Sequence, residues 1–292
     1  MHVGIFAKTF QRPTLEAILD SVQQHGIRSV QFNMSCAGLP SLPEFIENDL
    51  ADQIGEALRA RGIVMAAVSG TFNMIHPDHQ TRTDGLTRLG ELARVCKRLG
   101  TSIVTLSTGT RDPKDMWRRH RDNDSPGAWA DMRAAMAEAL HIAAQYQLNF
   151  AFEPELSNVV DSAKKARRLL DEMHSSNLKV VIDPANLFHE GDLPRMAEIL
   201  DEAFDLLGDA IILAHAKDLS QDGAAGNQAA GTGRLDYDRY IGLLERIGYH
   251  GPLILHGLTE DQVDGSVAFL RGKLDALKAH AERDREQTDA GV

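Results

Sequence analysis

Short apolar, strand-like segments alternate with helix-like segments along nearly the whole chain of 292 residues. Each strand-like segment is a run of Val, Ile, Leu, Phe and Ala, as expected for strands buried on both faces of a parallel sheet. Parallel strands that alternate with helices are joined by right-handed crossovers, and eight such units favour a closed barrel. The eight segments are HVGIFA, SVQFNM, VMAAVSG, SIVTLSTG, LNFAFEP, KVVIDP, IILAHAK and PLILHG.

Between these segments, apolar residues recur at helical spacing. One helical segment follows Asn158 and another follows Asp236, and we predict that both residues are N-caps. The last segment carries a stripe of Leu270, Leu274 and Leu277. We therefore predict an α/β protein with a single (β/α)8 TIM barrel over residues 1–280, followed by a polar C-terminal tail over 281–292.

An open, doubly wound sheet is the competing architecture. It usually has a glycine-rich phosphate-binding loop directly after its first strand, and this chain has none there. The only GxG, from Gly231 to Gly233, comes late in the chain and follows no predicted strand. Dinucleotide binding is therefore not indicated.

The formal net charge of -11 limits the partners that we expect. An acidic surface repels phosphate backbones and anionic lipid, which argues against nucleic acid or a membrane as a partner. No run approaches the roughly 18 apolar residues that a membrane span needs, and the N-terminus lacks the features of a signal peptide. Only Cys36 and Cys96 are present, without a CxxC, so we expect free thiols in a reducing cytoplasm.

Four strand-like segments end on a residue that can bind a metal. If the strands close into a barrel, their C-terminal ends converge on one face, and these residues can share one ion. Each has an ordinary alternative, because an acid at a strand end is commonly an N-cap or ion-pair partner and a histidine is commonly a hydrogen-bonded core residue. Together, two carboxylates and two imidazoles are suited to a divalent ion. The residues are Glu153, Asp183, His215 and His256.

Several longer segments resemble the xylose isomerase-like barrels, a family that includes sugar phosphate isomerases and epimerases, ketose 3-epimerases, hydroxypyruvate isomerases and inosose dehydratases, with type IV endonucleases as distant members. The resemblance covers nearly the whole chain, and the segments occur in the family's order. They are SGTFNMIHPD at 69–78, LGTSIVTLSTGTRD at 99–112, AFEPELSNVVDSAKKARRLL at 151–170, VVIDPANLF at 180–188, LAHAKDL at 213–219 and GTGRLDYDRYIGLLERIGYHGPL at 231–253.

The resemblance implies metal ligands at Glu153, Asp183 and His215, with a fourth at the end of the eighth strand. The better-known epimerases have a glutamate at that fourth place, paired with the glutamate of strand five as two bases, whereas this chain has His256. With two carboxylates and two imidazoles, the charge of a divalent ion is just balanced. Because nitrogen ligands shift preference away from magnesium, we expect manganese, zinc, cobalt or iron.

The ligand set suggests a reaction on a small substrate that has a hydroxyl next to a carbonyl. We expect the ion to bind both oxygens and to acidify the adjacent carbon, giving an enediolate that stays on the ion. Glu153, or a water that it orients, would remove the proton, and His256 or Lys217 would return one. The alternative for Lys217 is a solvated charge at the end of its strand.

Further residues near the strand ends are candidates for substrate contacts, each with a structural alternative. The alternatives are a loop cap for His76, exposed ion pairs for Arg111 and Lys8, and a loop charge or amide for Glu155 and Asn186. Trp117 lies in a long polar loop and is a candidate lid residue or an oligomer contact. The substrate-binding candidates are His76, Arg111, Glu155, Asn186 and Lys8.

Three functions stay open at the level of the sequence. The first is a metal-dependent isomerase or epimerase acting on a sugar, sugar phosphate or sugar acid. The second is a lyase of the inosose or dehydroshikimate dehydratase type, and the third is a barrel that binds a metabolite without catalysis. The acidic charge and the missing zinc ligands argue against a DNA-repair nuclease. A homo-oligomer is also left open, since related barrels often pair.

Overall fold

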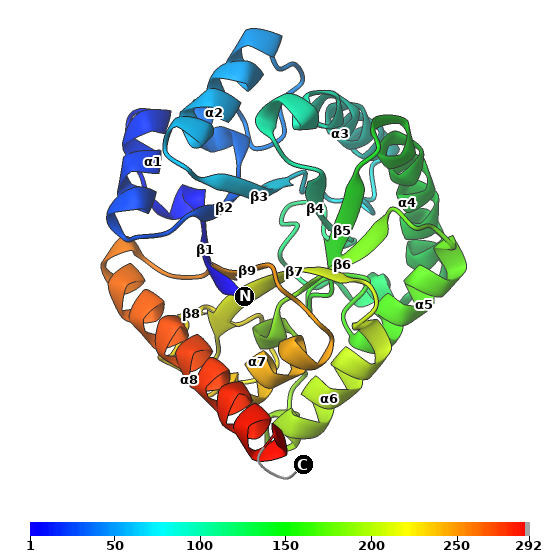
Figure 1. Cartoon of the computed structure of the whole chain (residues 1–292). Helices are drawn as coiled ribbons and strands as arrows, with labels where there is room; N and C mark the ends of the chain where they lie inside the picture. Colours follow the sequence, from blue (N-terminus) through cyan, green and yellow to red (C-terminus); the bar gives the residue numbers. More distant parts are fainter. Residues whose placement is uncertain (290–292) are drawn as a thin grey trace.

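A computed structural model of the chain describes the backbone of residues 1–289 and the side chains of residues 1–279. Eight parallel strands form a closed barrel inside a ring of helices (Figure 1), which confirms the predicted (β/α)8 fold. Strands β1 to β7 pair in chain order, and β9 closes the barrel between β7 and β1. The barrel strands are β1 (His2–Phe6), β2 (Ser29–Phe32), β3 (Val64–Ser69), β4 (Ile103–Ser107), β5 (Asn149–Glu153), β6 (Leu178–Ile182), β7 (Ile211–Asp218) and β9 (Pro252–Leu255).

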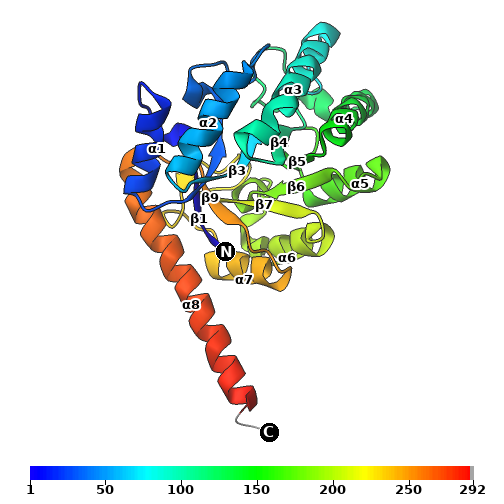
Figure 2. The same ribbon diagram turned by 45° about the horizontal axis from the view of Figure 1, so that its top comes forward.

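Within residues 1–289, the layer around the barrel contains eight α-helices, with several short 3₁₀ helices in the connecting loops. The α-helices are α1 (Leu15–Gln24), α2 (Asn48–Ala60), α3 (His79–Leu99), α4 (Pro126–Tyr146), α5 (Ala163–Met173), α6 (Met196–Leu207), α7 (Tyr237–Arg246) and α8 (Val263–Asp289). Figure 2 shows that the C-terminal part of α8 projects beyond the barrel. The predicted polar tail, 281–292, therefore begins within this helix, and residues 290–292 lie outside the described residues.

One strand was not predicted. β8 (Gln228–Ala229) has only two residues and pairs in antiparallel fashion with Lys217 and Asp218 at the end of β7. It lies in the long loop that joins β7 to α7. The pairing attaches this loop to the rim of the barrel at which the parallel strands end.

The two predicted N-caps have different outcomes. Asp236 caps α7 as predicted, because its Oδ1 accepts a hydrogen bond from the backbone N–H of Arg239 at 2.9 Å. The prediction for Asn158 is wrong, because α5 begins only at Ala163 and its N-cap is Ser162. Asn158 is instead fully buried in the preceding loop.

The barrel interior explains why polar residues gather at one end. Side chains alternate between the two faces of a strand, so residues two positions apart point the same way. A buried apolar cluster fills the barrel below the strand ends, and its members on β5, β6, β7 and β9 come two residues before Glu153, Asp183, His215 and His256. These four side chains therefore form the next layer of the interior. The apolar cluster consists of Phe6, Ala67, Ala151, Val181, Leu213 and Ile254.

Among the described residues, every helix is too short or too polar to cross a bilayer.

Candidate metal centre and substrate cavity

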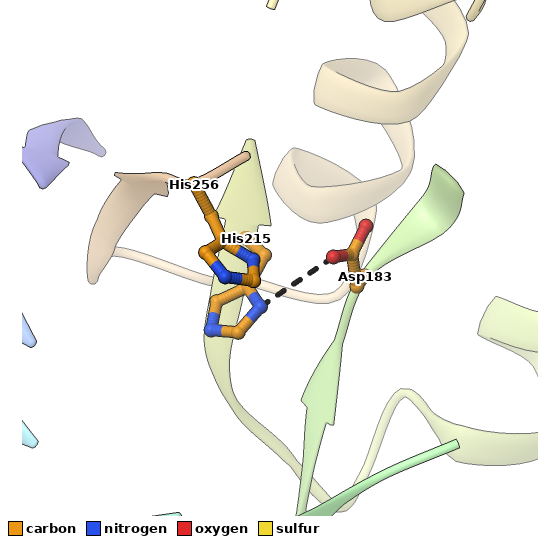
Figure 3. A group of neighbouring side chains, drawn as sticks. All are labelled: Asp183, His215 and His256. Carbon is orange, nitrogen blue, oxygen red and sulfur yellow. Dashed lines mark ion pairs between the residues drawn. The ribbon is translucent and has the colours of Figure 1, made fainter. Parts of the chain in front are cut away.

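The four predicted ligands meet at the C-terminal end of the barrel. His215 Nδ1 lies 3.5 Å from Glu153 Oε2 and 3.6 Å from Asp183 Oδ2. Figure 3 shows Asp183, His215 and His256 facing one another, and each offers a ligand atom within 4.8 Å of the other two. Strands that are far apart in the sequence thus bring these side chains together, as the closed barrel requires.

Glu153 lies at the edge of this group. It is not among the three residues whose ligand atoms all lie within 4.8 Å of one another. Its Oε1 accepts a hydrogen bond from Asn186 Nδ2 at 2.6 Å, while its Oε2 faces His215. Asn186 in turn accepts a hydrogen bond from the backbone N–H of Gly226 at 3.2 Å. Glu153 is therefore held in place beside the three closest ligands.

Gln31, which was not among the residues predicted from the sequence, orients His215. Gln31 Oε1 lies 2.8 Å from His215 Nε2, and Gln31 Nε2 donates to Thr105 Oγ1 at 3.2 Å. Because a carbonyl oxygen only accepts, His215 donates through Nε2 and turns the lone pair of Nδ1 toward the carboxylates. The signal for this residue was a glutamine in the middle of the buried strand SVQFNM.

Three buried polar atoms in the site lack a hydrogen-bond partner among the described residues: Asp183 Oδ2, His215 Nδ1 and His256 Nδ1. Buried polar atoms without partners are rare, and a bound ion is one way in which such atoms are satisfied. A divalent cation between them would bind two imidazole nitrogens and a carboxylate oxygen, a donor set that suits manganese, zinc, cobalt or iron. The residues present therefore fit a metal ion.

Lys217 supplies a positive charge inside the same site. Its Nζ lies 3.0 Å from Asp183 Oδ2, an ion pair that does not have hydrogen-bond geometry. Both side chains are buried. Burial opposes the charge on Lys217, but Asp183 and Glu153 outweigh it, and the pKa of the ammonium is raised. The prediction that Lys217 belongs to the site thus fits its position better than the solvated alternative.

The two carboxylates differ in basicity. The pKa of Glu153 is raised, because burial in the barrel removes water and the negative charge of Asp183 adds to the effect. Burial also opposes ionisation of Asp183, but Lys217 and His215 outweigh it and hold its pKa below the usual range. Glu153 is therefore the better proton acceptor, and Asp183 is the better permanent anion.

His256 is neutral at physiological pH, because burial and the nearby Lys217 ammonium hold its pKa well below the usual value. Its ring packs between two others, with centroid distances of 5.3 Å to Phe6 and 5.2 Å to His215. A neutral imidazole has a free lone pair, so His256 can serve as a metal ligand.

A cavity of about 550 Å³ opens above the four residues. Its volume lies within the range of about 300–1,000 Å³ that is typical of small-molecule sites. Besides Glu153, His215 and His256, four further predicted residues line it, namely Lys8, Glu155, Asn186 and Lys217. Trp117 also lines it, with 57% of its surface exposed. Further polar groups come from β2, β3 and β4 and from the loops after β2 and β3: Gln31, Asn33, Ser41, Ser69, Thr71, Thr105 and Ser107.

Two of the predicted substrate contacts, Arg111 and His76, do not line the cavity. Arg111 is paired with Asp131 at 2.7 Å and donates to the backbone carbonyl of Ile75 at 3.1 Å. His76 Nε2 lies 3.2 Å from the carbonyl oxygen of Pro113. Both instead connect the loops that follow β3 and β4.

Glu155 is a buried acid on the cavity wall. Burial and the neighbouring Glu153 raise its pKa to about 7, although the Ser157 hydroxyl donates a hydrogen bond to it. Asn158 Nδ2 donates a second hydrogen bond at 3.1 Å. The carboxyl group is therefore partly protonated near neutral pH, so it can either donate or accept a proton.

The late GxG serves a carboxylate of the protein itself. Asp218, fully buried at the end of β7, accepts hydrogen bonds from the backbone N–H groups of Gly231 and Gly233 at 3.1 and 3.0 Å, and from those of Leu219 and Leu235 at 2.9 Å each. A Cβ on Gly233 would overlap with Asp218 Oδ1, so a side chain there would displace the carboxylate. The glycines thus close the loop after β7 around Asp218.

The fold and the site together define a class of protein: a (β/α)8 barrel whose strand ends carry carboxylates and imidazoles that could hold a divalent ion. The chain belongs to the xylose isomerase-like TIM barrel family, whose model matches residues 19–273.

Comparisons with known proteins give both a sequence relative and structural neighbours. The ketose 3-epimerase of Arthrobacter globiformis is 23% identical to this chain over 159 residues. The matched residues cover 53% of this chain and 50% of that relative, so the chain spans about half the length of the relative. A D-tagatose 3-epimerase-like protein superposes with a TM-score of 0.76 at 14% identity, over 96% of this chain and 100% of that one. The IOLI protein, solved with a bound zinc atom, gives a TM-score of 0.70 at 18% identity, over 92% and 95%.

Proposed function

We propose that the protein is a divalent-metal-dependent isomerase or epimerase that acts on a small compound with a hydroxyl next to a carbonyl: a sugar, sugar phosphate or sugar acid. One observation carries this proposal. Asp183, His215 and His256 present buried ligand atoms without hydrogen-bond partners at the floor of a cavity, directly beside the more basic carboxylate of Glu153. Membership of the family and the ketose 3-epimerase relative support the same reaction class.

Asp183, His215 and His256 would hold the ion, with Glu153 next to them. When bound, the ion supplies a Lewis acid that polarises the substrate carbonyl and stabilises negative charge on its oxygen. Gln31 keeps His215 Nδ1 directed toward this place through its bond to Nε2. The negative charge of Asp183, maintained by Lys217, attracts the cation.

Glu153 is the proposed base. Its side chain is 21% exposed and faces the cavity, and its raised pKa makes it a stronger acceptor for the proton on the carbon next to the carbonyl. Asn186 holds one of its oxygens, so the other is the one that is free to accept. The opposite pKa shifts of Lys217 and His256 support different roles for them. Lys217 stays protonated and is the better donor, whereas neutral His256 is the better ligand.

A second candidate is a lyase that removes the same proton and expels a β-hydroxyl. Glu155 favours it, because a carboxyl group with a pKa of about 7 on the cavity wall is partly protonated at neutral pH and can protonate a departing hydroxyl. The products separate the two reactions, since only the lyase product has lost the mass of water.

The test is a screen of ketoses, sugar phosphates, sugar acids and inososes in deuterated water, with protein stripped of metal and restored with Mn²⁺. We expect deuterium at the carbon next to the carbonyl in at least one compound, without loss of mass for an isomerase or epimerase. Glu153→Gln should abolish the exchange, while the exposed Glu138→Gln is the matched control. If no compound exchanges, the proposal fails; if the product has lost water, the lyase replaces the isomerase.

We also propose a cytoplasmic location and a small molecule as the main partner. Cys36 and Cys96 are both free and buried, which suits a reducing compartment. The cavity has the size of a small-molecule site, and the net charge of -11 disfavours nucleic acid.

A further inference from the structure

A second, larger cavity adjoins the first on the same face of the barrel. It measures about 740 Å³ and shares Phe6, Lys8 and His256 with the cavity above the metal ligands. We call the two the outer and the inner cavity. The outer cavity is open to solvent and is otherwise lined by the segment after β1, by Asn227 in the β7–α7 loop, and by the 257–262 segment between β9 and α8. Because these three shared residues line both spaces, the two cavities lie side by side.

The inner cavity alone is large enough for a small substrate. Its 550 Å³ already falls within the usual range for ligand sites, and it contains Glu153, Glu155 and Lys217. A single sugar bound there would leave the outer cavity to solvent. The outer cavity therefore offers a second ligand-sized space next to the reacting centre.

The walls of the outer cavity are mostly neutral and polar. Thr9, Gln11 and Asn227 contribute a hydroxyl and two amides, and their side chains make no hydrogen bond with any other residue that the structure describes. Hydroxyl and amide groups that converge beside an aromatic ring can bind a neutral, hydroxyl-rich ligand, because they both donate and accept hydrogen bonds. Phe6 provides such a ring.

The charges around the outer cavity argue against a phosphorylated group in it. Glu260 is held by Arg12, whose Nη1 lies 2.9 Å from Glu260 Oε2. This leaves Lys8, whose Nζ lies 4.6 Å from the centre of the Phe6 ring, as the cation at the junction of the two cavities. A phosphate generally requires several convergent cations or N–H donors. One lysine beside an acidic residue does not supply them.

We propose that the substrate is a glycoside, with the reacting hydroxy-carbonyl sugar in the inner cavity and a second, neutral sugar ring in the outer cavity. This inference rests on the proposed function, because it assumes that the reaction occurs at Glu153. The bond between the two sugars lies beside Phe6, Lys8 and His256, the three residues that line both cavities. Gln11 and Asn227 bind the hydroxyls of the second ring.

Fructose and isomaltulose make a matched pair of probes. Both have a ketone next to a hydroxyl-bearing carbon, and isomaltulose carries a glucose unit on the far end of its fructose unit. With Mn²⁺ present, we expect kcat/KM for deuterium exchange to be about tenfold or more higher for isomaltulose. Gln11→Trp, a change at an exposed position that places an indole ring in the space proposed for the second sugar, should remove this advantage and leave exchange into fructose unchanged. Asn227→Trp repeats the test from the opposite wall.

Saturation-transfer NMR gives a readout that does not depend on turnover. With the same protein and isomaltulose, we expect transfer to the protons of the glucose unit, and we expect Gln11→Trp to remove it. Equal exchange of both sugars, unaffected by either tryptophan variant, would overturn the glycoside proposal and leave the proposed function standing. If neither sugar nor any compound of the wider screen exchanges deuterium, the proposed function fails. Absence of saturation transfer to the glucose unit of isomaltulose overturns the glycoside proposal, whatever the exchange experiment shows.

Discussion

Lys217 Nζ lies 3.0 Å from Asp183 Oδ2, the same oxygen that faces His215 Nδ1 at 3.6 Å. A buried ammonium and the proposed divalent ion thus share one carboxylate oxygen. Without an ion, Lys217 compensates the two carboxylates Asp183 and Glu153. With an ion present, the positive charge of Lys217 weakens the attraction between that oxygen and the metal. Lys217 therefore links the stability of the protein to its affinity for metal.

Replacing Lys217 by methionine should separate these two effects. Lys217→Met leaves Asp183 buried without its charge partner, and breaking a buried pair in this way costs about 3–5 kcal/mol. The metal-free variant should therefore unfold at a lower temperature than the wild type. Because the ion then meets no competing ammonium, added Mn²⁺ should raise the melting temperature of the variant more than that of the wild type.

The matched control for this experiment is Lys164→Met, which removes an exposed lysine that is paired with Glu202 at 2.8 Å. Surface pairs of this kind contribute at most about 1 kcal/mol, so little change is expected. The interpretation of Lys217 would be contradicted by two results together. Without metal, Lys217→Met would melt at the same temperature as the wild type, and Mn²⁺ would raise the melting temperatures of both proteins equally.

The identity of the ion should follow from the two imidazoles. Nitrogen ligands favour manganese, zinc, cobalt or iron over magnesium, so titration calorimetry should give tighter binding for Mn²⁺ or Zn²⁺ than for Mg²⁺. His256→Glu replaces a nitrogen ligand by a carboxylate and should bring the affinity for Mg²⁺ closer to the affinities for Mn²⁺ and Zn²⁺. Asp183→Asn should weaken the binding of every ion. Full occupancy by Mg²⁺ alone, with the same affinity as Mn²⁺, would exclude this assignment.

The sequence predicted the barrel and the four central residues because both depend on local patterns. Buried parallel strands are nearly continuous apolar runs, and a polar residue at the end of such a run is conspicuous. Closure of the barrel then brings the strand ends together, whatever the loops do. This is why Glu153, Asp183, His215 and His256 could be grouped from the order of residues alone.

The remaining features depend on tertiary contacts that a linear pattern does not contain. Asn158 stands before an apolar stripe, as an N-cap would, but it hydrogen-bonds with Ser107 Oγ and with the backbone N–H of Gly109 across the barrel rim. Arg111 is a basic residue near a strand end, but Asp131 on α4 pairs with it and holds it away from the cavity. Partners from other elements decide where such side chains lie.

Asp218→Asn tests how the loop after β7 is held. Each carboxylate oxygen of Asp218 accepts two backbone N–H groups, so an amide nitrogen in place of one oxygen leaves two donors without an acceptor. A buried unsatisfied group costs about 1–3 kcal/mol, and we expect the free energy of unfolding to fall by about 3 kcal/mol in urea titrations. The control is Asp238→Asn, at an exposed residue paired with Lys273. Equal stability of the two variants would show that the loop does not depend on Asp218.

The two thiols should give the unfolding free energy a dependence on alkaline pH. Burial raises the pKa of Cys96 from 9.0 to about 12 and that of Cys36 to about 11. Above about pH 9, the unfolded chain loses thiol protons that the folded protein keeps, so stability falls as the pH rises through this range. At about pH 10, Cys96 alone should account for about 1.4 kcal/mol, and Cys96→Ala should remove that share of the decrease measured from about pH 8.

The native protein should also resist Ellman's reagent at about pH 8, whereas the urea-unfolded chain reacts at both cysteines. Rapid reaction of the native protein, or an unchanged pH dependence in Cys96→Ala, would contradict the assigned burial.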